Sequence, residues 1–503
     1  MSRATREFRL PRAATRRRAL ALALACACAC APAWAAGASG DSFPATPPAP
    51  GPAPTLRVPT PSLQTLANGL QVVSVRRAGL PLVTAQLLLR SGGEMDPVAL
   101  AGVSDLTANL LAKGAAGKSA PQIAAAAEAL GGSLAASAGW DQAAVGITVT
   151  TPRLPQALAL LADVARRPDF GDEELKRAQA QAIDDLRLEL SQPTSLAQLA
   201  ANRAVFGGGA YGHSRAGTPV SLAKITRADV QAQHAALYRP DNAILVLAGD
   251  ITPEQAVQLA QASFGDWQAP ATALPAASAG NGNGALPALL VIDQHGAGQA
   301  GVVAAHAAPP RKDADYYIGT VANAVLGGSY SARLNEEIRI KRGLSYGAFS
   351  DLDGRRDSGL WLGSAQTKNP SAPQVVELML GEFSRLGAAP VPAGELAARK
   401  ATLVGGYGRS LETTAGLAAQ VGDLAVYGID FGEIGRYVER VQAVTPAQVQ
   451  AYAGTHLSAG GTRMVVVGDA AQFGAALAKA YPQAETLQSD RLDLDSADLE
   501  PVK

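Results

Sequence analysis

Cysteine is almost absent from this 503-residue chain, since Cys26, Cys28 and Cys30 all fall within its first 35 residues. Those residues have the features of an export signal. Four arginines between residues 12 and 18 precede an apolar run over residues 19–31, and Ala33-Trp34-Ala35 offers a small-residue cleavage site. We expect residues 1–35 to be a signal peptide. The mature chain would then lack both disulfides and thiolate metal ligands, although export leads to an oxidising compartment.

Long apolar runs are also absent, because no later stretch reaches about 18 uninterrupted apolar residues, the length that a spanning helix needs. The run over residues 19–31 is itself too short to cross a bilayer comfortably. We therefore expect an exported protein, periplasmic in the leading interpretation. An uncleaved anchor and a lipid anchor on Cys26 stay open as alternatives.

An excess of positive charge is the third absence. The chain has 43 basic and 43 acidic side chains, but residues 1–35 hold seven of the former and one of the latter. The remainder carries 36 basic against 42 acidic side chains, a formal charge of −6. A nucleic-acid partner is not expected, because phosphate binding needs a basic surface. The hydrophobic content of 48% suits a globular protein, and the length predicts two or more domains.

Low-complexity stretches divide the chain. Residues 36–56 form a Pro/Ala-rich tether, and residues 269–287 contain Ala-Ser-Ala-Gly-Asn-Gly-Asn-Gly, which is typical of an exposed linker. The predicted lobes are residues 57–268 and 288–485. An acidic tail over residues 486–503 is expected to be loose.

The two lobes share an internal repeat. Four identities lie at a constant offset of 219 residues: Thr226/Thr445, Val230/Val449, Gly249/Gly468 and Asp250/Asp469. In each copy the Thr is placed to cap a helix, and a buried-type strand then ends at Gly-Asp. Chance similarity in an Ala-rich chain is the alternative to two copies of one domain.

Hydrophobic periodicity in the first lobe predicts strands and helices in partial succession, which indicates an α+β fold. We expect two homologous lobes, each a mostly antiparallel sheet packed with helices. The predicted strands are 70–75, 82–89 and 144–151, and the predicted helices are 101–113, 122–130, 154–166 and 172–190.

The sequence lacks the residue patterns of three common kinds of site: a pair of metal-binding histidines, a phosphate loop and a serine nucleophile elbow. None of the five histidines, His213, His234, His295, His306 and His456, has another within five residues, so each is interpreted as a surface, turn or core residue. Gly327-Gly328-Ser329 lacks the Gly-Lys-Ser/Thr ending of a phosphate loop, and no Gly-x-Ser-x-Gly elbow is present.

The most informative segment covers residues 327–350. Ser331 is placed to cap a helix that runs through Arg339, and Gly343 is placed to end it before a strand from Leu344 through Tyr346. This corner predicts that Arg339 and Tyr346 face a common cavity. From spacing alone, a surface Arg and a core Tyr remain the alternative. Arg333 and Glu337 are expected to form an exposed i,i+4 pair on the helix.

Two segments resemble the pitrilysin-type zinc peptidases, a family that includes the mitochondrial processing peptidases. Residues 89–111 are similar to the segment with the inverted motif His-x-x-Glu-His, but the matching positions here are Asp105, Ala108 and Asn109. The family's further Glu ligand would fall near Ile183, Asp184 or Asp185. The resemblance therefore implies no catalytic residue and no bound cofactor in this chain; a pair of carboxylates such as Asp105 and Asp184 would hold zinc weakly.

Residues 327–350 closely resemble the second-lobe signature of the same family, in which an Arg and a Tyr seven residues later grip the substrate. The resemblance implies that Arg339 and Tyr346 bind peptide. It also implies a processing-peptidase-like fold over residues 57–485. We expect a substrate-binding subunit of a heterodimeric metallopeptidase, inactive alone, whose homologous partner supplies the zinc. A stand-alone peptide-binding or scaffolding protein and a weak peptidase with an unrecognised site are the alternatives.

Overall fold

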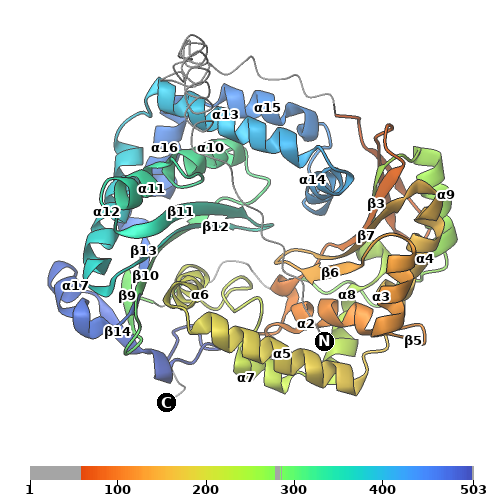
Figure 1. The fold of residues 1–503 in the computed structure, drawn as a ribbon, viewed down its shortest axis with the longest axis horizontal. Helices are drawn as coiled ribbons and strands as arrows, with labels where there is room; N and C mark the ends of the chain where they lie inside the picture. Colours follow the sequence, from red (N-terminus) through yellow and green to blue (C-terminus); the bar gives the residue numbers. More distant parts are fainter. Residues whose placement is uncertain (1–57, 278–283, 285, 501–503) are drawn as a thin grey trace, which may run out of the picture. The chain divides into compact units, whose positions relative to one another are not determined.

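A computed structural model describes residues 58–277, 284 and 286–500 of the chain (Figure 1). The predicted signal peptide and tether, residues 1–35 and 36–56, lie outside the described residues. The described residues all fall within one compact unit. None of the described helices combines the length and apolar character needed to cross a membrane.

The first lobe is built on a six-stranded sheet in the order β1-β2-β8-β3-β7-β6. Strands β2 and β8 are parallel, and every other neighbouring pair is antiparallel. The strands are β1 (Ser62–Thr65), β2 (Gln71–Arg76), β3 (Leu82–Leu89), β6 (Ala135–Ala138), β7 (Ala143–Thr150) and β8 (Ala243–Gly249). A separate two-stranded ladder joins β4 (Gly114–Ala115) to β5 (Lys118–Ser119).

The second lobe has the strand order β11-β12-β10-β13-β9-β14 and repeats the first in its five inner and edge strands β11, β12, β10, β13 and β9. It differs in its sixth strand, because β14 is parallel to β9 whereas β1 is antiparallel to β2. Its central β13 occupies the place of β8, and β9 and β10 flank it as β2 and β3 flank β8. The match confirms two homologous, mostly antiparallel lobes. The strands are β9 (Leu289–Asp293), β10 (Ala300–Ala308), β11 (Ser345–Gly354), β12 (Gly359–Thr367), β13 (Arg463–Gly468) and β14 (Glu485–Gln488).

Helices bury one face of each sheet in a separate hydrophobic core. The repeat predicted from the sequence has the same local cause in both lobes. Thr226 caps the helix before β8 and Thr445 caps the helix before β13, each accepting a hydrogen bond from the backbone three residues on. The helices of the first core are α2 (Val103–Leu110), α3 (Ala120–Ala129), α4 (Leu154–Arg166), α5 (Asp172–Leu190), α7 (Pro219–Lys224), α8 (Arg227–Leu237) and α9 (Pro253–Phe264). Those of the second are α10 (Tyr316–Leu326), α11 (Arg333–Asn335), α12 (Ala372–Ala388), α13 (Ala393–Ser410), α15 (Glu433–Ala443), α16 (Pro446–His456) and α17 (Gly474–Ala480).

The lobes exchange one helix each across their remaining sheet faces. Helix α6 (Pro193–Phe206) belongs to the first half of the sequence but packs on β9, β10 and β13 of the second sheet. Reciprocally, α14 (Thr414–Val426) packs on β2, β3 and β8 of the first sheet. Each lobe thus buries apolar surface that belongs to the other, which sequence periodicity did not indicate.

The acidic tail is not loose, which corrects the prediction for its described residues. Strand β14 pairs with β9, and Leu499 is buried with α6. Thr218 Oγ1 in the first lobe donates to Asp495 Oδ1 at 2.8 Å.

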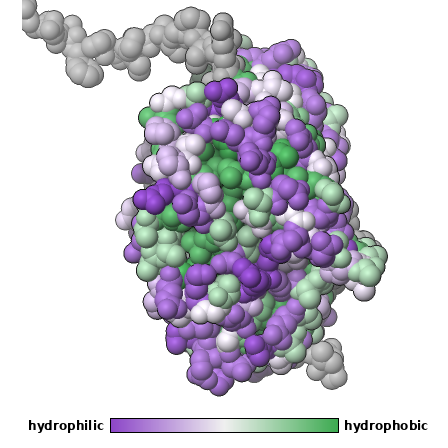
Figure 2. Space-filling view, turned by 90° about the vertical axis from the view of Figure 1, so that its right-hand side faces the viewer, coloured by the Kyte–Doolittle hydropathy of each residue, from purple (hydrophilic) through white to green (hydrophobic). Residues whose placement is uncertain are grey.

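The side of the molecule that carries α3, α4 and α9 shows apolar patches separated by hydrophilic side chains (Figure 2).

Candidate functional site

The segment that carries Arg339 and Tyr346 is a short helix, a wide turn and a strand. Helix α11 continues into a π-helical turn over Glu336–Ile340, a form that is often found at functional sites. Gly343 follows at φ +63°, which confirms its predicted role in ending the helix. The predicted cap is wrong: Ala332 holds the N-cap position, and the Ser331 hydroxyl instead accepts from Arg399 Nη1 at 2.6 Å.

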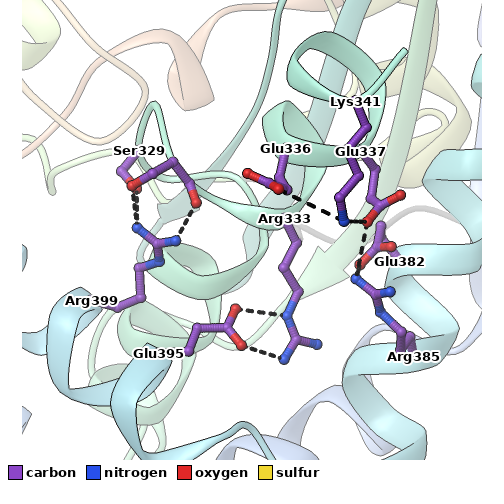
Figure 3. A network of polar contacts seen from close by, with 10 residues as sticks. Ser329, Arg333, Glu336, Glu337, Lys341, Glu382, Arg385, Glu395 and Arg399 are labelled. Carbon is purple, nitrogen blue, oxygen red and sulfur yellow. Dashed lines mark hydrogen bonds and ion pairs between the residues drawn. The ribbon is translucent and has the colours of Figure 1, made fainter.

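A network of ion pairs joins this turn to helices α12 and α13 (Figure 3). Arg333 binds both oxygens of Glu395 at 2.8 and 2.9 Å. Glu337, which is buried, accepts from Lys341 and Arg342 at 2.6 Å each. The predicted exposed pair between Arg333 and Glu337 is therefore wrong, because α12 and α13 cover this side of the turn and supply other partners. The network ties the turn to α12 and α13 and does not include Arg339.

Arg339 and Tyr346 both keep their hydrogen-bond donors free within the described residues. The Arg339 guanidinium lies over the Tyr330 ring, 4.7 Å from its centroid. Tyr346 is 90% exposed, so it is not the core tyrosine of the alternative interpretation. Neither side chain donates to the other in the part of the chain that the structure describes. Arg339 lies on the π-helical turn and Tyr346 at the start of β11. Free donors at these two places suit binding of carbonyl oxygens from an incoming chain.

The three predicted motif positions, Asp105, Ala108 and Asn109, all lie on α2. Asp105 Oδ1 accepts from Arg215 Nη1 at 2.6 Å, and the same nitrogen donates to the Ala138 carbonyl of β6 at 2.7 Å. Burial raises the pKa of Asp105, and the charge of Arg215 opposes the rise. Ala108 is fully buried. The guanidinium therefore supplies the positive charge beside Asp105.

The third position, Asn109, is exposed and lines a cavity of about 830 Å³ between α3 and α5. Asp185 lines the same cavity, whereas Asp184 pairs with Arg187. A zinc ion does not fit these residues, because Asp105 is neutralised by Arg215 and Ala108 offers no donor atom. Across residues 58–500 as described, no group of three or more His, Cys, Asp or Glu side chains is arranged to hold a metal.

Four of the histidines occupy structural positions. His234 Nε2 lies 2.8 Å from the Ala165 carbonyl, and His306 Nε2 lies 2.7 Å from Thr462 Oγ1. Burial lowers the pKa of His213, His234 and His306. His456 packs against the Tyr452 ring. These side chains are spread over both cores, as their spacing in the sequence predicted.

One pocket was missed by sequence reasoning. It measures about 330 Å³, lies at the end of β11 and is lined by tyrosines and carboxylates from five elements. The only sequence signal is the alternation of Asp351 and Asp353 on a strand, because its other residues are up to about 85 positions away in the chain.

Comparisons with known proteins identify the family. Residues 71–218 match the family described as Insulinase (Peptidase family M16), and residues 224–403 match the Peptidase M16 inactive domain. An uncharacterized zinc protease of Mycobacterium leprae is 25% identical over 391 residues, covering 77% of this chain and 87% of the relative. An uncharacterized zinc protease of Bacillus subtilis is 23% identical, covering 70% and 84%.

Solved structures show the same fold. A peptidase M16 inactive domain from Pseudomonas fluorescens is 26% identical with a TM-score of 0.76, covering 81% of this chain and 98% of that one. A protease from Helicobacter pylori has a TM-score of 0.76 at 19% identity, covering 82% of this chain and 100% of that one. The predicted pitrilysin-type resemblance is thereby confirmed: the chain belongs to peptidase family M16.

Proposed function

We propose that this chain is the non-catalytic, substrate-binding subunit of a heterodimeric zinc peptidase that acts on peptides or unfolded segments. The observation that carries the proposal is the contrast between its lobes. Arg339 presents free donors on the anchored turn and Tyr346 presents its hydroxyl at the start of β11, whereas Asp105 is neutralised by Arg215. A homologous partner would supply the zinc and with it the activated water.

In this arrangement the two donors bind and orient the peptide. The Arg339 guanidinium and the Tyr346 hydroxyl donate to peptide carbonyl oxygens or to the negative charge that develops at the scissile bond. The ion pairs of Arg333 and Glu337 keep the turn from shifting when the peptide enters. No proton transfer or nucleophilic step is assigned to this chain.

The test is hydrolysis of a quenched fluorescent peptide by this chain, by a zinc-motif homologue from the same genome, and by their mixture. We expect activity only in the mixture, and loss of it with a chelator. Arg339→Ala lowers kcat/KM by about 100-fold, because one lost oxyanion-type donor has an effect of that size. Arg187→Ala, an exposed arginine on α5, is the matched control. Chelator-insensitive hydrolysis by this chain alone would sink the proposal.

A stand-alone peptide-binding protein is the second candidate. The 830 Å³ cavity beside Asn109 favours it, since alanines and Ile123 give this cavity apolar walls. Peptide affinity that is the same with and without the partner, in a mixture that never hydrolyses peptide, would select this candidate. We further propose export to the periplasm, which cell fractionation tests.

A further inference from the structure

Strand β11 presents one continuous exposed face that begins at Tyr346. Ser345 pairs with Thr367 and Ala348 pairs with Ala365, so two residues of β11 oppose one residue of β12. This bulge puts Tyr346 on the same face as Phe349, Asp351 and Asp353. Tyr346, Phe349 and Asp351 are exposed. The edge of β11 is partly paired, because the Ala348 N–H donates to Asn335 Oδ1 and the Ser350 N–H donates to the Gly327 carbonyl, each at 3.1 Å. The exposed face of the strand is therefore what remains open to a ligand.

The pocket of about 330 Å³ opens at the carboxyl-terminal part of this strand. Its wall combines aromatic rings with negative charge. Tyr407 stacks on Tyr437, with ring centroids 3.9 Å apart, and Tyr317 meets Tyr437 edge-on. Rings and carboxylates together favour cations over neutral or anionic groups. The pocket's tyrosines include Tyr317, Tyr407 and Tyr437, and its carboxylates include Asp351, Asp353 and Asp423.

The chain's own Arg311 shows how the wall holds a cation. Its guanidinium lies 3.9 Å from the centroid of the Tyr316 ring and donates to Asp423 Oδ2 at 3.1 and 2.8 Å. Asp353 pairs with Arg355, and Glu433 has arginine partners on its own helix. The chain's own arginines therefore already pair with Asp423, Asp353 and Glu433.

Asp351 is the exception, because it has no ion-pair partner among the described residues. Burial raises its pKa, and the charge of Asp353 raises it further. Asp351 is nevertheless exposed, so an incoming group can reach it. A cation placed against Asp351 would offset both the cost of burying its charge and the repulsion from Asp353. It would not need to displace Arg311 or Arg355.

We propose that this pocket binds the lysine or arginine side chain of a peptide that lies extended over the exposed face of β11, from Tyr346 to Asp351. The peptide part rests on the proposed function. Because strands rise about 3.3 Å per residue, the basic residue lies four or five positions from the residue held at Tyr346. The site thus selects peptides by a positive charge at a fixed distance from the Arg339/Tyr346 grip.

The experiment compares the binding of two fluorescent peptides to the full chain, one with lysine at the selected position and one with norleucine. We expect the lysine peptide to bind about tenfold more tightly. Asp351→Asn removes this preference and leaves the norleucine peptide unchanged. Glu439→Gln, an exposed carboxylate on α15, is the matched control and changes neither. Equal affinity for both peptides in the wild-type chain, or equal weakening of both by Asp351→Asn, overturns the pocket assignment.

Two further measurements separate this proposal from the proposed function. Arg339→Ala is expected to weaken both peptides alike and to keep the lysine preference. Titration with Nα-acetyl-lysine amide tests the pocket without a peptide backbone. Binding of this amide by the wild-type chain and not by Asp351→Asn, with no binding of either peptide, sinks the proposed function and keeps the pocket. Absence of binding by the amide and of any lysine preference overturns the pocket.

Discussion

Arg356, in the turn between β11 and β12, donates to Glu94 Oε1 of the first lobe at 3.0 Å, and the Glu94 side chain is 1% exposed. The same guanidinium donates to the carbonyls of Arg90 and Asp141. Beside it, Arg355 lies over the rings of Trp140, Phe206 and Tyr211, 4.6 to 5.0 Å from their centroids. The tip of one hairpin in the second lobe is therefore locked into the first.

Replacing Arg356 tests this lock. Arg356→Ala leaves the buried Glu94 side chain and the carbonyls of Arg90 and Asp141 without their donor. Each buried acceptor left unsatisfied costs about 1–3 kcal/mol, so the total loss should be about 3 kcal/mol or more. We expect a fall of that size in the free energy of unfolding, measured by urea denaturation. Arg187→Ala removes an exposed pair with Asp184 and should change it by about 0.5 kcal/mol at most. Similar effects of the two variants would contradict a role of Arg356 between the lobes.

Glu94 also predicts a pH dependence. Burial and then the charge of Asp141 raise its pKa to about 8 despite Arg356. Between about pH 4.5 and 8 the folded chain keeps a proton that the unfolded chain releases, so stability falls as the pH rises through this window. The wild-type chain should lose up to about 1.4 kcal/mol per pH unit relative to Glu94→Gln.

Urea unfolding at intervals from pH 4.5 to 9 measures this difference, and subtraction removes other groups such as Asp96, whose pKa burial raises to about 7. Glu128→Gln, an exposed carboxylate on α3, should show no such slope. A wild-type chain that gains stability relative to Glu94→Gln as the pH rises would show that the Arg356 charge outweighs burial.

The helix exchange depends on a close approach at Gly301 of β10. A Cβ there would lie 2.5 Å from the backbone nitrogen of Thr194 in α6. Because backbone cannot yield like a side chain, Gly301→Ala should cost about 1–3 kcal/mol. Gly405→Ala on the exposed side of α13 meets nothing closer than 3.7 Å and should stabilise the chain by about 0.5–1 kcal/mol. Thermal or urea unfolding measures the expected loss of stability in Gly301→Ala and the expected gain in Gly405→Ala.

Local patterns predicted much of the fold, because a strong hydrophobic periodicity over a short window indicates both the type and the bounds of a helix or strand. Leu82–Leu89, Leu154–Arg166 and Asp172–Leu190 have the predicted bounds. Strand β6 was missed, since Ala135–Ala138 has no apolar alternation. The contacts that define the site were beyond reach, because Asp105 and Arg215 are 110 residues apart. Long-range pairs leave no mark on local periodicity.

Replacing Tyr346 should affect peptide hydrolysis much more than stability. Its side chain is 90% exposed, so Tyr346→Phe should change the free energy of unfolding by no more than about 0.5 kcal/mol. The lost hydroxyl should lower peptide hydrolysis by the two-chain mixture about tenfold. Parallel urea and kinetic measurements on the same preparation check both. A stability loss that matches the activity loss would assign Tyr346 a structural role instead.

The pairing of Asp105 with Arg215 predicts how a metal site can be rebuilt. Asp105→His/Asn109→His places two imidazoles one turn apart on α2, near Asp185. The Arg215 guanidinium, 2.6 Å from Asp105 in the native chain, would repel the ion. Adding Arg215→Gln should therefore raise zinc affinity at least about tenfold, measured by competition with a zinc-binding dye, whereas Asn109→His alone binds weakly. If Arg215→Gln leaves the affinity of the double-histidine variant unchanged, the guanidinium does not occupy the place of a metal charge.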